Sequence, residues 1–385
     1  MSTEPQPPEI AASQARASIA SWLGVLFLLV LLLVGVGGFV RLTQSGLSLP
    51  GWPFVNGKLL PPVTEAGWTE MYGLYLEDMD QMIALQEQGK VGLGALGHMP
   101  RDLADFQRIF IIEWSHRAIA IIVGLVGLAC LMTIFRKPAL RQLAGRPLTA
   151  IVSLIVVQSI IGGILVHTYT STHWLFVHLG VATLILGLIL WTLLLMLRSD
   201  DEPLAQRVHE GRSWPRRWAT AALMLVFIQI ILGALVAGSR HNGFSTTWPT
   251  MNGELIPTLW MTGKGLMWNL LDNPTLHQWV HRWFAWTAVI AVAAMTVMAT
   301  RAPLGLRGRI AVRVAFSTLI VQVILGIMNV QYGAAIPIAL SHLIVGMILY
   351  SALVLAVFDM RNEPECVADE TPQKSSRLAM AGGQP

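Results

Sequence analysis

The stretch Trp174–Leu197 has the sequence WLFVHLGVATLILGLILWTLLLML and contains no Asp, Glu, Lys or Arg. It is long enough to cross the hydrocarbon core of a bilayer, which takes about 20 apolar residues. It nevertheless carries a histidine, His178, near its beginning. Ionisable residues are rare inside membrane helices and mark a functional site by default. The stretch therefore predicts a membrane-spanning helix with a site inside it.

Seven further segments have the same apolar character, and the whole chain is poor in charge. Only 12% of its residues are charged, whereas a soluble domain carries roughly 25%. None of the segments alternates polar and apolar residues as a β-barrel strand must. We therefore predict an all-α integral membrane protein with eight transmembrane helices. The other seven lie near residues 20–40, 109–135, 148–167, 217–238, 277–300, 310–330 and 337–358.

The basic residues predict the orientation of these helices. Arg and Lys are concentrated in segments 136–146, 198–217 and 301–309, whereas the short connections 168–173 and 331–336 hold neither. Basic loops stay on the cytoplasmic side. We therefore expect a multi-pass protein of the cell inner (cytoplasmic) membrane, with both termini in the cytoplasm. The net charge of +4 follows from this topology and does not indicate binding to nucleic acid.

The chain also repeats itself, which predicts two tandem four-helix bundles related by internal duplication. The N-terminal half would cover residues 19–198 and the C-terminal half residues 217–358, joined by a cytoplasmic linker, 199–216. We expect the polar tails, 1–18 and 359–385, to be disordered. The repeated elements are Glu113-Trp114-Ser115-His116-Arg117 with Gln278-Trp279-Val280-His281-Arg282; Gln158, Gly162 and His178 with Gln322, Gly326 and His342; and Trp52-Pro53 with Trp248-Pro249.

Four of the repeated residues are histidines: His116, His178, His281 and His342. At a rise of about 1.5 Å per residue, all four lie at a similar depth near the outer ends of their helices. Two imidazoles on facing helices can hold one planar macrocycle from both sides, as helix bundles do with bis-histidine heme. We therefore predict one such site in each half.

Other interpretations of the histidines remain. Zinc fits less well, because structural sites use four Cys or His ligands and catalytic sites usually three. Copper stays open, although no Met or Cys accompanies both pairs. The histidines can also be core residues that hydrogen-bond between helices, although the repetition favours ligands. His277, one turn before His281, could line or substitute at that site. Glycines such as Gly162 and Gly326 thin the helix surface for close packing or a flat ligand.

The two halves differ at one ionisable position. Glu113 stands three residues before His116 and on the same helix face, whereas its counterpart is Gln278. A carboxylate at this depth must be protonated, paired or used. One interpretation is an ion pair with Arg117 or another arginine at the outer surface. The other is that the first half is the reacting site and the second holds electrons. Arg117 and Arg282 are candidates to bind heme propionates, and snorkelling to the headgroups is the alternative.

These motifs, in this order and with eight spans, resemble those of the heme A synthase family over about residues 36–350. The resemblance rests on Gly46-Leu47-Ser48 with Trp52-Pro53, on the two histidine-arginine motifs, and on His178 and His342. It implies an oxidoreductase that converts a ring methyl of heme O to a formyl group, giving heme A for terminal oxidases. Heme O would lie between His116 and His178 with Glu113 as the catalytic carboxylate. A heme b would lie between His281 and His342.

The resemblance also bears on partners and mechanism. It points to heme O synthase and cytochrome oxidase assembly factors as partners, with membrane lipid around the chain and an unidentified electron donor. Two histidines leave no open position on the iron, so one of them must leave or oxidation must occur at the porphyrin edge. The alternative function is a bis-histidine diheme electron-transfer cytochrome that does not modify heme, and a third class is a transporter or assembly scaffold. The extra segment 65–107 predicts a short amphipathic helix.

Overall fold

The computed structural model describes residues 8–49, 51, 60–88, 99–169, 171–198, 213–239, 245–301 and 304–362. These residues form ten helices and, outside them, one isolated β-bridge between Met251 and Glu254. Eight of the helices are long and apolar enough to cross a membrane, which confirms the predicted all-α membrane fold. The helices are α1 (Pro8–Leu42), α2 (Glu65–Glu87), α3 (Leu103–Phe135), α4 (Pro138–His167), α5 (Thr172–Leu197), α6 (Ser213–Gly238), α7 (Leu266–Asp272), α8 (Pro274–Ala299), α9 (Leu306–Gln331) and α10 (Ile336–Asn362).

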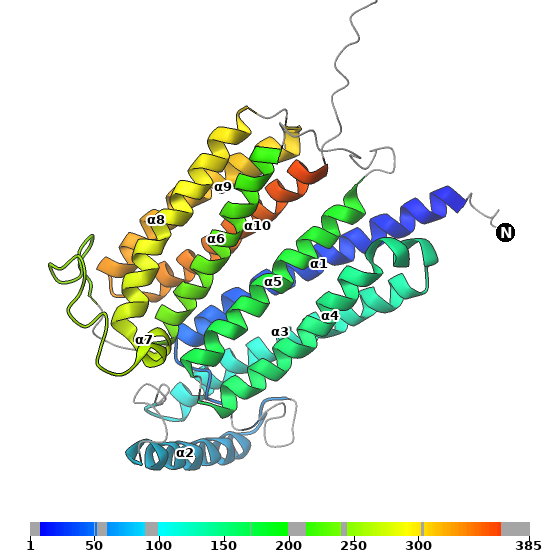
Figure 1. Cartoon of the computed structure of the whole chain (residues 1–385). Helices are drawn as coiled ribbons and strands as arrows, with labels where there is room; N and C mark the ends of the chain where they lie inside the picture. Colours follow the sequence, from blue (N-terminus) through cyan, green and yellow to red (C-terminus); the bar gives the residue numbers. More distant parts are fainter. Residues whose placement is uncertain are drawn as a thin grey trace, which may run out of the picture.

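The eight long helices form two bundles of four (Figure 1). In the first, α1, α3, α4 and α5 contact one another in a closed ring; in the second, α6, α8, α9 and α10 do so in the same order. The bundles meet where α1 and α5 contact α10 and where α5 contacts α6. The short helix α7 and the transverse helix α2 lie at the same end of the molecule (Figure 1), called here the α2 end.

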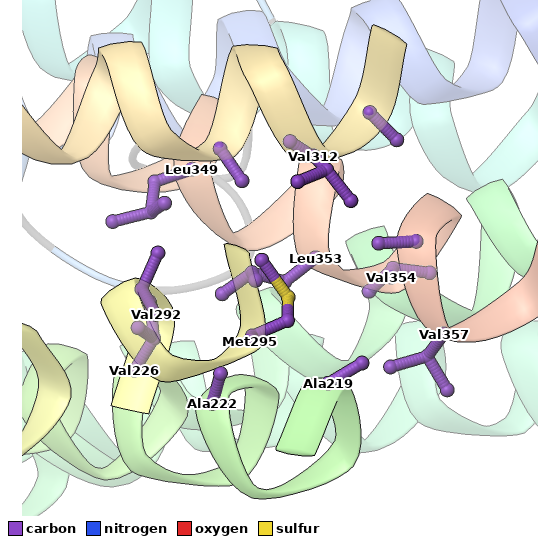
Figure 2. Close-up of a cluster of buried hydrophobic side chains, with 14 of the residues drawn as sticks. Ala219, Ala222, Val226, Val292, Met295, Val312, Leu349, Leu353, Val354 and Val357 are labelled. Carbon is purple, nitrogen blue, oxygen red and sulfur yellow. The ribbon is translucent and has the colours of Figure 1, made fainter. Parts of the chain in front are cut away.

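The core of the second bundle is built from small and medium side chains on all four of its helices. Ala219, Ala222, Val292, Met295 and Leu353 are buried in one cluster (Figure 2). Small residues let helix backbones approach closely, which matters in a membrane because lipid tails provide no hydrophobic drive for helix association. A corresponding cluster fills the first bundle between α1, α3, α4 and α5.

Glycines allow the two bundles to pack together. A Cβ atom on Gly38 of α1 would clash with the Leu343 side chain of α10. One on Gly187 of α5 would come within 2.5 Å of the Tyr350 hydroxyl of α10. Arg41, at the end of α1, donates hydrogen bonds to the carbonyl oxygens of Ala237 and Gly238 at the end of α6. The bundles are therefore joined both through their cores and at the α2 end.

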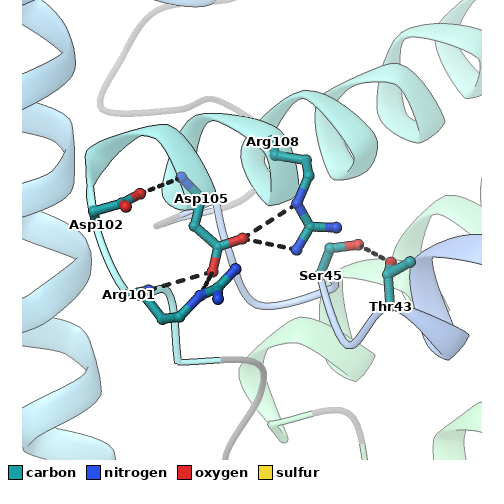
Figure 3. Close-up of polar contacts among 6 residues, drawn as sticks. All are labelled: Thr43, Ser45, Arg101, Asp102, Asp105 and Arg108. Atoms are coloured by element: carbon teal, nitrogen blue, oxygen red, sulfur yellow. Dashed lines mark hydrogen bonds and ion pairs between the residues drawn. The ribbon is translucent and has the colours of Figure 1, made fainter.

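The start of α3 is fixed by a polar network (Figure 3). The side chain of Asp102 caps the helix by accepting a hydrogen bond of 2.8 Å from the backbone nitrogen of Asp105. The Asp105 carboxylate in turn forms an ion pair of 2.7 Å with Arg108 and accepts a hydrogen bond from the backbone of Arg101. A capped start at Leu103 explains why α3 begins six residues before the predicted span at 109.

Segment 65–87 forms the helix predicted for the extra loop, and it packs on this end of α3. Met71, Tyr75, Met79 and Met82 follow one face of α2 and are buried with Phe106 and Phe110 of α3. Aromatic rings join the two helices, with Trp68 edge-on to Phe110 at 5.0 Å. The other face is acidic and exposed. In the second bundle, the described residues between the first two long helices form one helix, the seven-residue α7.

The prediction that residues 1–18 form a disordered tail is partly wrong. Residues 8–18 belong to α1, because their alanine-rich sequence favours helix and Arg16 bonds to the carbonyl oxygens of Leu195, Met196 and Arg198 at the end of α5. The tail expected from residue 359 begins with helical residues too, since α10 continues to Asn362. Residues 363–385, and residues 199–212 of the predicted linker, lie outside the described part of the chain.

Candidate functional site

The structure places the four predicted histidines on the helices that run away from the α2 end, where each ring packs against a glycine of a neighbouring helix. His116 of α3 faces Gly37 of α1, where a Cβ atom would lie only 2.9 Å from the imidazole Cε1. His178 of α5 faces Gly162 of α4 at the looser distance of 3.4 Å. The missing side chains therefore make room for the two imidazoles inside the first bundle.

The second bundle repeats this arrangement. A Cβ atom on Gly233 of α6 would lie 3.0 Å from Cε1 of His281, and one on Gly326 of α9 would lie 3.1 Å from Cε1 of His342. Within each bundle the two histidines stand on helices that face each other across the ring of contacting helices, His116 and His178 on α3 and α5, His281 and His342 on α8 and α10. Each bundle thus brings together one pair of imidazoles from opposite sides of its helix ring.

Three glutamines approach these histidines, each four residues before the glycine on the same helix. Gln158 donates a hydrogen bond of 2.9 Å from its amide nitrogen to the backbone oxygen of His178. Gln229 makes the same bond to His281, also 2.9 Å, and its amide nitrogen lies 3.1 Å from the ring nitrogen Nδ1. Gln322 places its amide nitrogen 3.3 Å from Nε2 of His342. The sequence repeat identifies Gln158 and Gln322 but not Gln229. The signal for Gln229 is the spacing Gln-x-x-x-Gly, which recurs on all three helices.

Glu113 is buried, with an exposed fraction of 5%, and it is paired. The Nε atom of Arg117 lies 2.9 Å from a Glu113 carboxylate oxygen, and the same guanidinium donates through Nη1 to the backbone oxygen of Gly51 at 2.8 Å. The ion pair that we considered from the sequence is therefore present. The guanidinium also ties the segment after α1 to α3, and its Nη2 is buried without a partner among the described residues.

The second bundle replaces this ion pair with hydrogen bonds to backbone. Arg282 donates to the backbone oxygen of Thr247 at 2.8 Å and to that of Ser245 at 2.6 Å. Gln278 also donates to the Ser245 oxygen, at 3.1 Å. Arg117 and Arg282 therefore both hold the segment that follows the first helix of their bundle, but only the first bundle has a buried carboxylate beside its histidine.

The remaining histidines in the described part of the chain do not join these pairs. Both ring nitrogens of His277 are engaged, Nδ1 with the Ser239 hydroxyl at 2.7 Å and Nε2 with the Leu270 carbonyl oxygen at 2.9 Å. It therefore connects α8 to the ends of α6 and α7, and it is not free to replace His281. The Nε2 atom of His173 lies 3.1 Å from a carboxylate oxygen of Asp272. His98, His209 and His241, and the motif Trp52-Pro53, lie outside the described residues.

The donor set suits a ligand held by two imidazoles. Within the described ranges no group of three or more His, Cys, Asp or Glu side chains is placed to hold a metal ion. Each site therefore provides two imidazole donors, apolar helix surfaces and glycines that leave space beside the rings. A planar macrocycle with an axial ligand on each face needs this combination.

The chain is similar to known proteins over most of its length. The profile of the COX15-CtaA family, described as cytochrome oxidase assembly protein, matches residues 20–354. The chain is similar to the heme A synthase of Erythrobacter litoralis, with 36% identity over 86% of this chain and 94% of that protein. It is also similar to the heme A synthase of Paracoccus denitrificans, with 35% identity over 89% of this chain and 87% of that protein. Both relatives align with it across the two bundles.

Proposed function

The chain belongs to the COX15-CtaA family of cytochrome oxidase assembly proteins, and we propose that it oxidises a ring methyl of heme O to a formyl group, as a heme A synthase. The heme A synthase function rests on similarity to relatives of that name over most of both chains. The observation that carries the reaction is the pair of buried histidine sites, each against helical glycines, with an acidic residue beside only one of them.

The first bundle is the proposed substrate site. His116 and His178 would hold heme O, and Glu113 lies on the same face of α3 as His116, one turn closer to the α2 end. The conversion of a methyl to a formyl group adds one oxygen atom and removes four electrons and four protons when water supplies the oxygen. A buried carboxylate near the ring can accept such protons. The Arg117 guanidinium fixes the Glu113 carboxylate in place.

The second bundle is the proposed electron-holding site. His281 and His342 would hold a heme b, whose iron changes oxidation state without leaving the protein. Gln278 stands where the first bundle has Glu113, so this site has no carboxylate to take part in proton transfer. One guanidinium nitrogen of Arg282, Nε, is buried and unpartnered in the described structure. Arg117 and Arg282 are therefore candidates to bind the propionates of the two hemes.

The proposed location is the bacterial cytoplasmic membrane, with both termini in the cytoplasm and the α2 end outside. The basic residues of the α3–α4 connection, Arg136 and Lys137, lie at the end of the bundle opposite α2 and support this orientation. The histidines would then lie toward the outer face. Heme O synthase and cytochrome oxidase assembly factors are the proposed partners. The reaction with water requires an electron acceptor, and neither this acceptor nor the electron donor expected from the resemblance is assigned.

The test is chromatography of hemes extracted from cells that co-express this chain with a heme O synthase. We expect a heme A peak that disappears in His116→Ala and in Glu113→Gln, while Glu113→Gln still retains heme. The matched control is the double variant Glu113→Gln with Gln278→Glu. It places a carboxylate in the second bundle and should not restore heme A formation. Heme B bound without any heme A would instead favour the diheme electron-transfer cytochrome. Normal heme A formation by Glu113→Gln would exclude the catalytic role of that carboxylate.

A further inference from the structure

The four histidines differ in how their neighbouring helix holds them. Gln158, Gln229 and Gln322 contact His178, His281 and His342 respectively. At the matching position of α1, four residues before Gly37, the chain has Leu33. Between Val25 and Val40 helix α1 carries no side chain that can form a hydrogen bond. His116 therefore has a glycine beside its ring but no glutamine.

The glutamines are suited to orient a ligating ring. Each of the three has a buried Oε1 atom without a partner among the described residues, and the Nδ1 atoms of His178 and His342 are likewise buried and unpartnered. An amide has both donors and an acceptor, so its nitrogen can bond the backbone while its oxygen receives the N–H of the imidazole. A metal-bound histidine nearly always donates its second ring nitrogen in this way, and loss of the acceptor typically weakens metal binding 10- to 100-fold.

His116 lacks this support. Its Nδ1 atom is buried and has no hydrogen-bond partner within the described structure. The nearby carboxylate of Glu113 is engaged by Arg117 at 2.9 Å. Gly37 provides a close steric contact, with only 2.9 Å from a Cβ position to the ring, but such a contact limits where the ring fits without fixing a bond to it. The Nδ1 atoms of His178 and His342 are equally unpartnered, and Gln158 bonds the backbone oxygen of His178. His116 therefore differs from the other three in that its neighbouring helix offers no amide that could hold it.

We propose that His116 is the axial ligand that detaches from the substrate site during turnover, while His178, His281 and His342 stay bound. This inference rests on the proposed heme A synthase function. Two histidines would fill both axial positions of a bound heme, so a small ligand could reach the iron only where one of them leaves. The residue type at this position then distinguishes the two sites: the proposed substrate site has Leu33, and the electron-holding site has Gln229 beside His281.

The experiment measures binding of carbon monoxide to the reduced, heme-loaded protein, since this ligand binds iron only where an axial position opens. The wild type should bind it at one of its two hemes. Leu33→Gln should weaken this binding about tenfold or more, at unchanged heme content, by supplying the missing amide. Gln229→Leu should create binding at the second heme. Leu32→Gln is the matched control, because it adds the same amide to α1 at an exposed position and should leave the binding unchanged.

Gln229→Leu introduces no polar group into the membrane, so it remains informative if Leu33→Gln does not fold. The inference is overturned if the reduced wild type binds no carbon monoxide, or if a folded Leu33→Gln variant binds it as tightly as the wild type. It is also overturned if Gln229→Leu gains no binding. Hemes extracted from the same preparations test the proposed function separately. Heme A in the wild type, together with unchanged carbon monoxide binding in the variants, would reject the role of the glutamines and leave the heme A synthase function standing.

Discussion

Replacing Gly37 by alanine should remove most of the heme from the first bundle. The new Cβ atom would lie 2.9 Å from Cε1 of His116, whereas carbon atoms pack best at about 3.5–4.0 Å. The ring must then move by about 0.6 Å or more, while a metal–ligand distance tolerates changes of only about 0.2 Å. Overpacking of this kind costs about 1–3 kcal/mol, which corresponds to a roughly 5- to 150-fold loss of heme affinity.

The four glycines give a graded series. The corresponding distances are 3.0 Å for Gly233, 3.1 Å for Gly326 and 3.4 Å for Gly162. The last is close to ordinary van der Waals contact, so Gly162→Ala should lose less than about 1 kcal/mol, below the range for overpacking. Heme loss should therefore be greatest for Gly37→Ala, followed by the changes at Gly233 and Gly326. The change at Gly162 should have almost no effect on heme content.

The assay is the heme content per chain and the absorption spectrum of each purified variant. Gly24→Ala is the matched control, because Gly24 lies on the same helix as Gly37 and has open space around its Cβ position. An alanine there should stabilise the helix by about 0.5–1 kcal/mol and leave heme binding intact. The argument fails if Gly37→Ala binds heme with an unchanged spectrum, or if Gly24→Ala loses as much heme as Gly37→Ala does.

Three further predictions concern the scaffold. Asp102→Ala removes the cap of α3 and should lower the free energy of unfolding by about 1 kcal/mol, seen as a lower melting temperature in detergent; an unchanged melting temperature would contradict the cap. Arg307→Gln leaves the buried Asp359 carboxylate without its 2.8 Å ion pair and should cost about 1–3 kcal/mol in the same assay, whereas Arg309→Gln, at an exposed position, should have no effect. Burial raises the pKa of Tyr75 to about 12, so its contribution to α2 docking is complete below about pH 10 and is lost as the pH rises toward 12. The fluorescence of Trp68 should change as α2 undocks. The Tyr75→Phe variant should lack this pH-dependent change.

The fold was predictable because membrane spans are encoded locally. A helix of apolar residues satisfies all of its backbone hydrogen bonds within one segment, so composition alone located all eight spans. The ends were less predictable. Helix α4 begins at Pro138, ten residues before the predicted span, because Arg141 and Arg146 end the apolar run but do not break the helix. The charged residues mark where the hydrocarbon ends, and the backbone continues beyond it.

The site was predictable only where the repeat made it visible. The histidines stand out because each has a counterpart at a matching place in the other half. The contact between Gln229 and His281 joins residues 52 positions apart on α6 and α8, and no local pattern states which helices pack together. The glycines were explained from the sequence as general packing residues. Their specific contact, with the histidine rings, depends on the helix pairing as well.

The two bundles differ most clearly, around the histidines, in one pair of helices. Gln158 on α4 and Gln322 on α9 occupy equivalent sequence positions, although Gln158 contacts the backbone oxygen of His178 and Gln322 the ring nitrogen of His342. The α1–α3 pair differs from the α6–α8 pair twice, with Leu33 in place of Gln229 and Glu113 in place of Gln278. One change removes an amide from the ligand, and the other places a carboxylate on its helix face. Both changes lie on the α1–α3 pair that carries His116, and the proposed division into a reacting and an electron-holding site rests on them. It follows that the double change Gln229→Leu and Gln278→Glu should make His281 resemble His116 in ligand exchange, without altering His342.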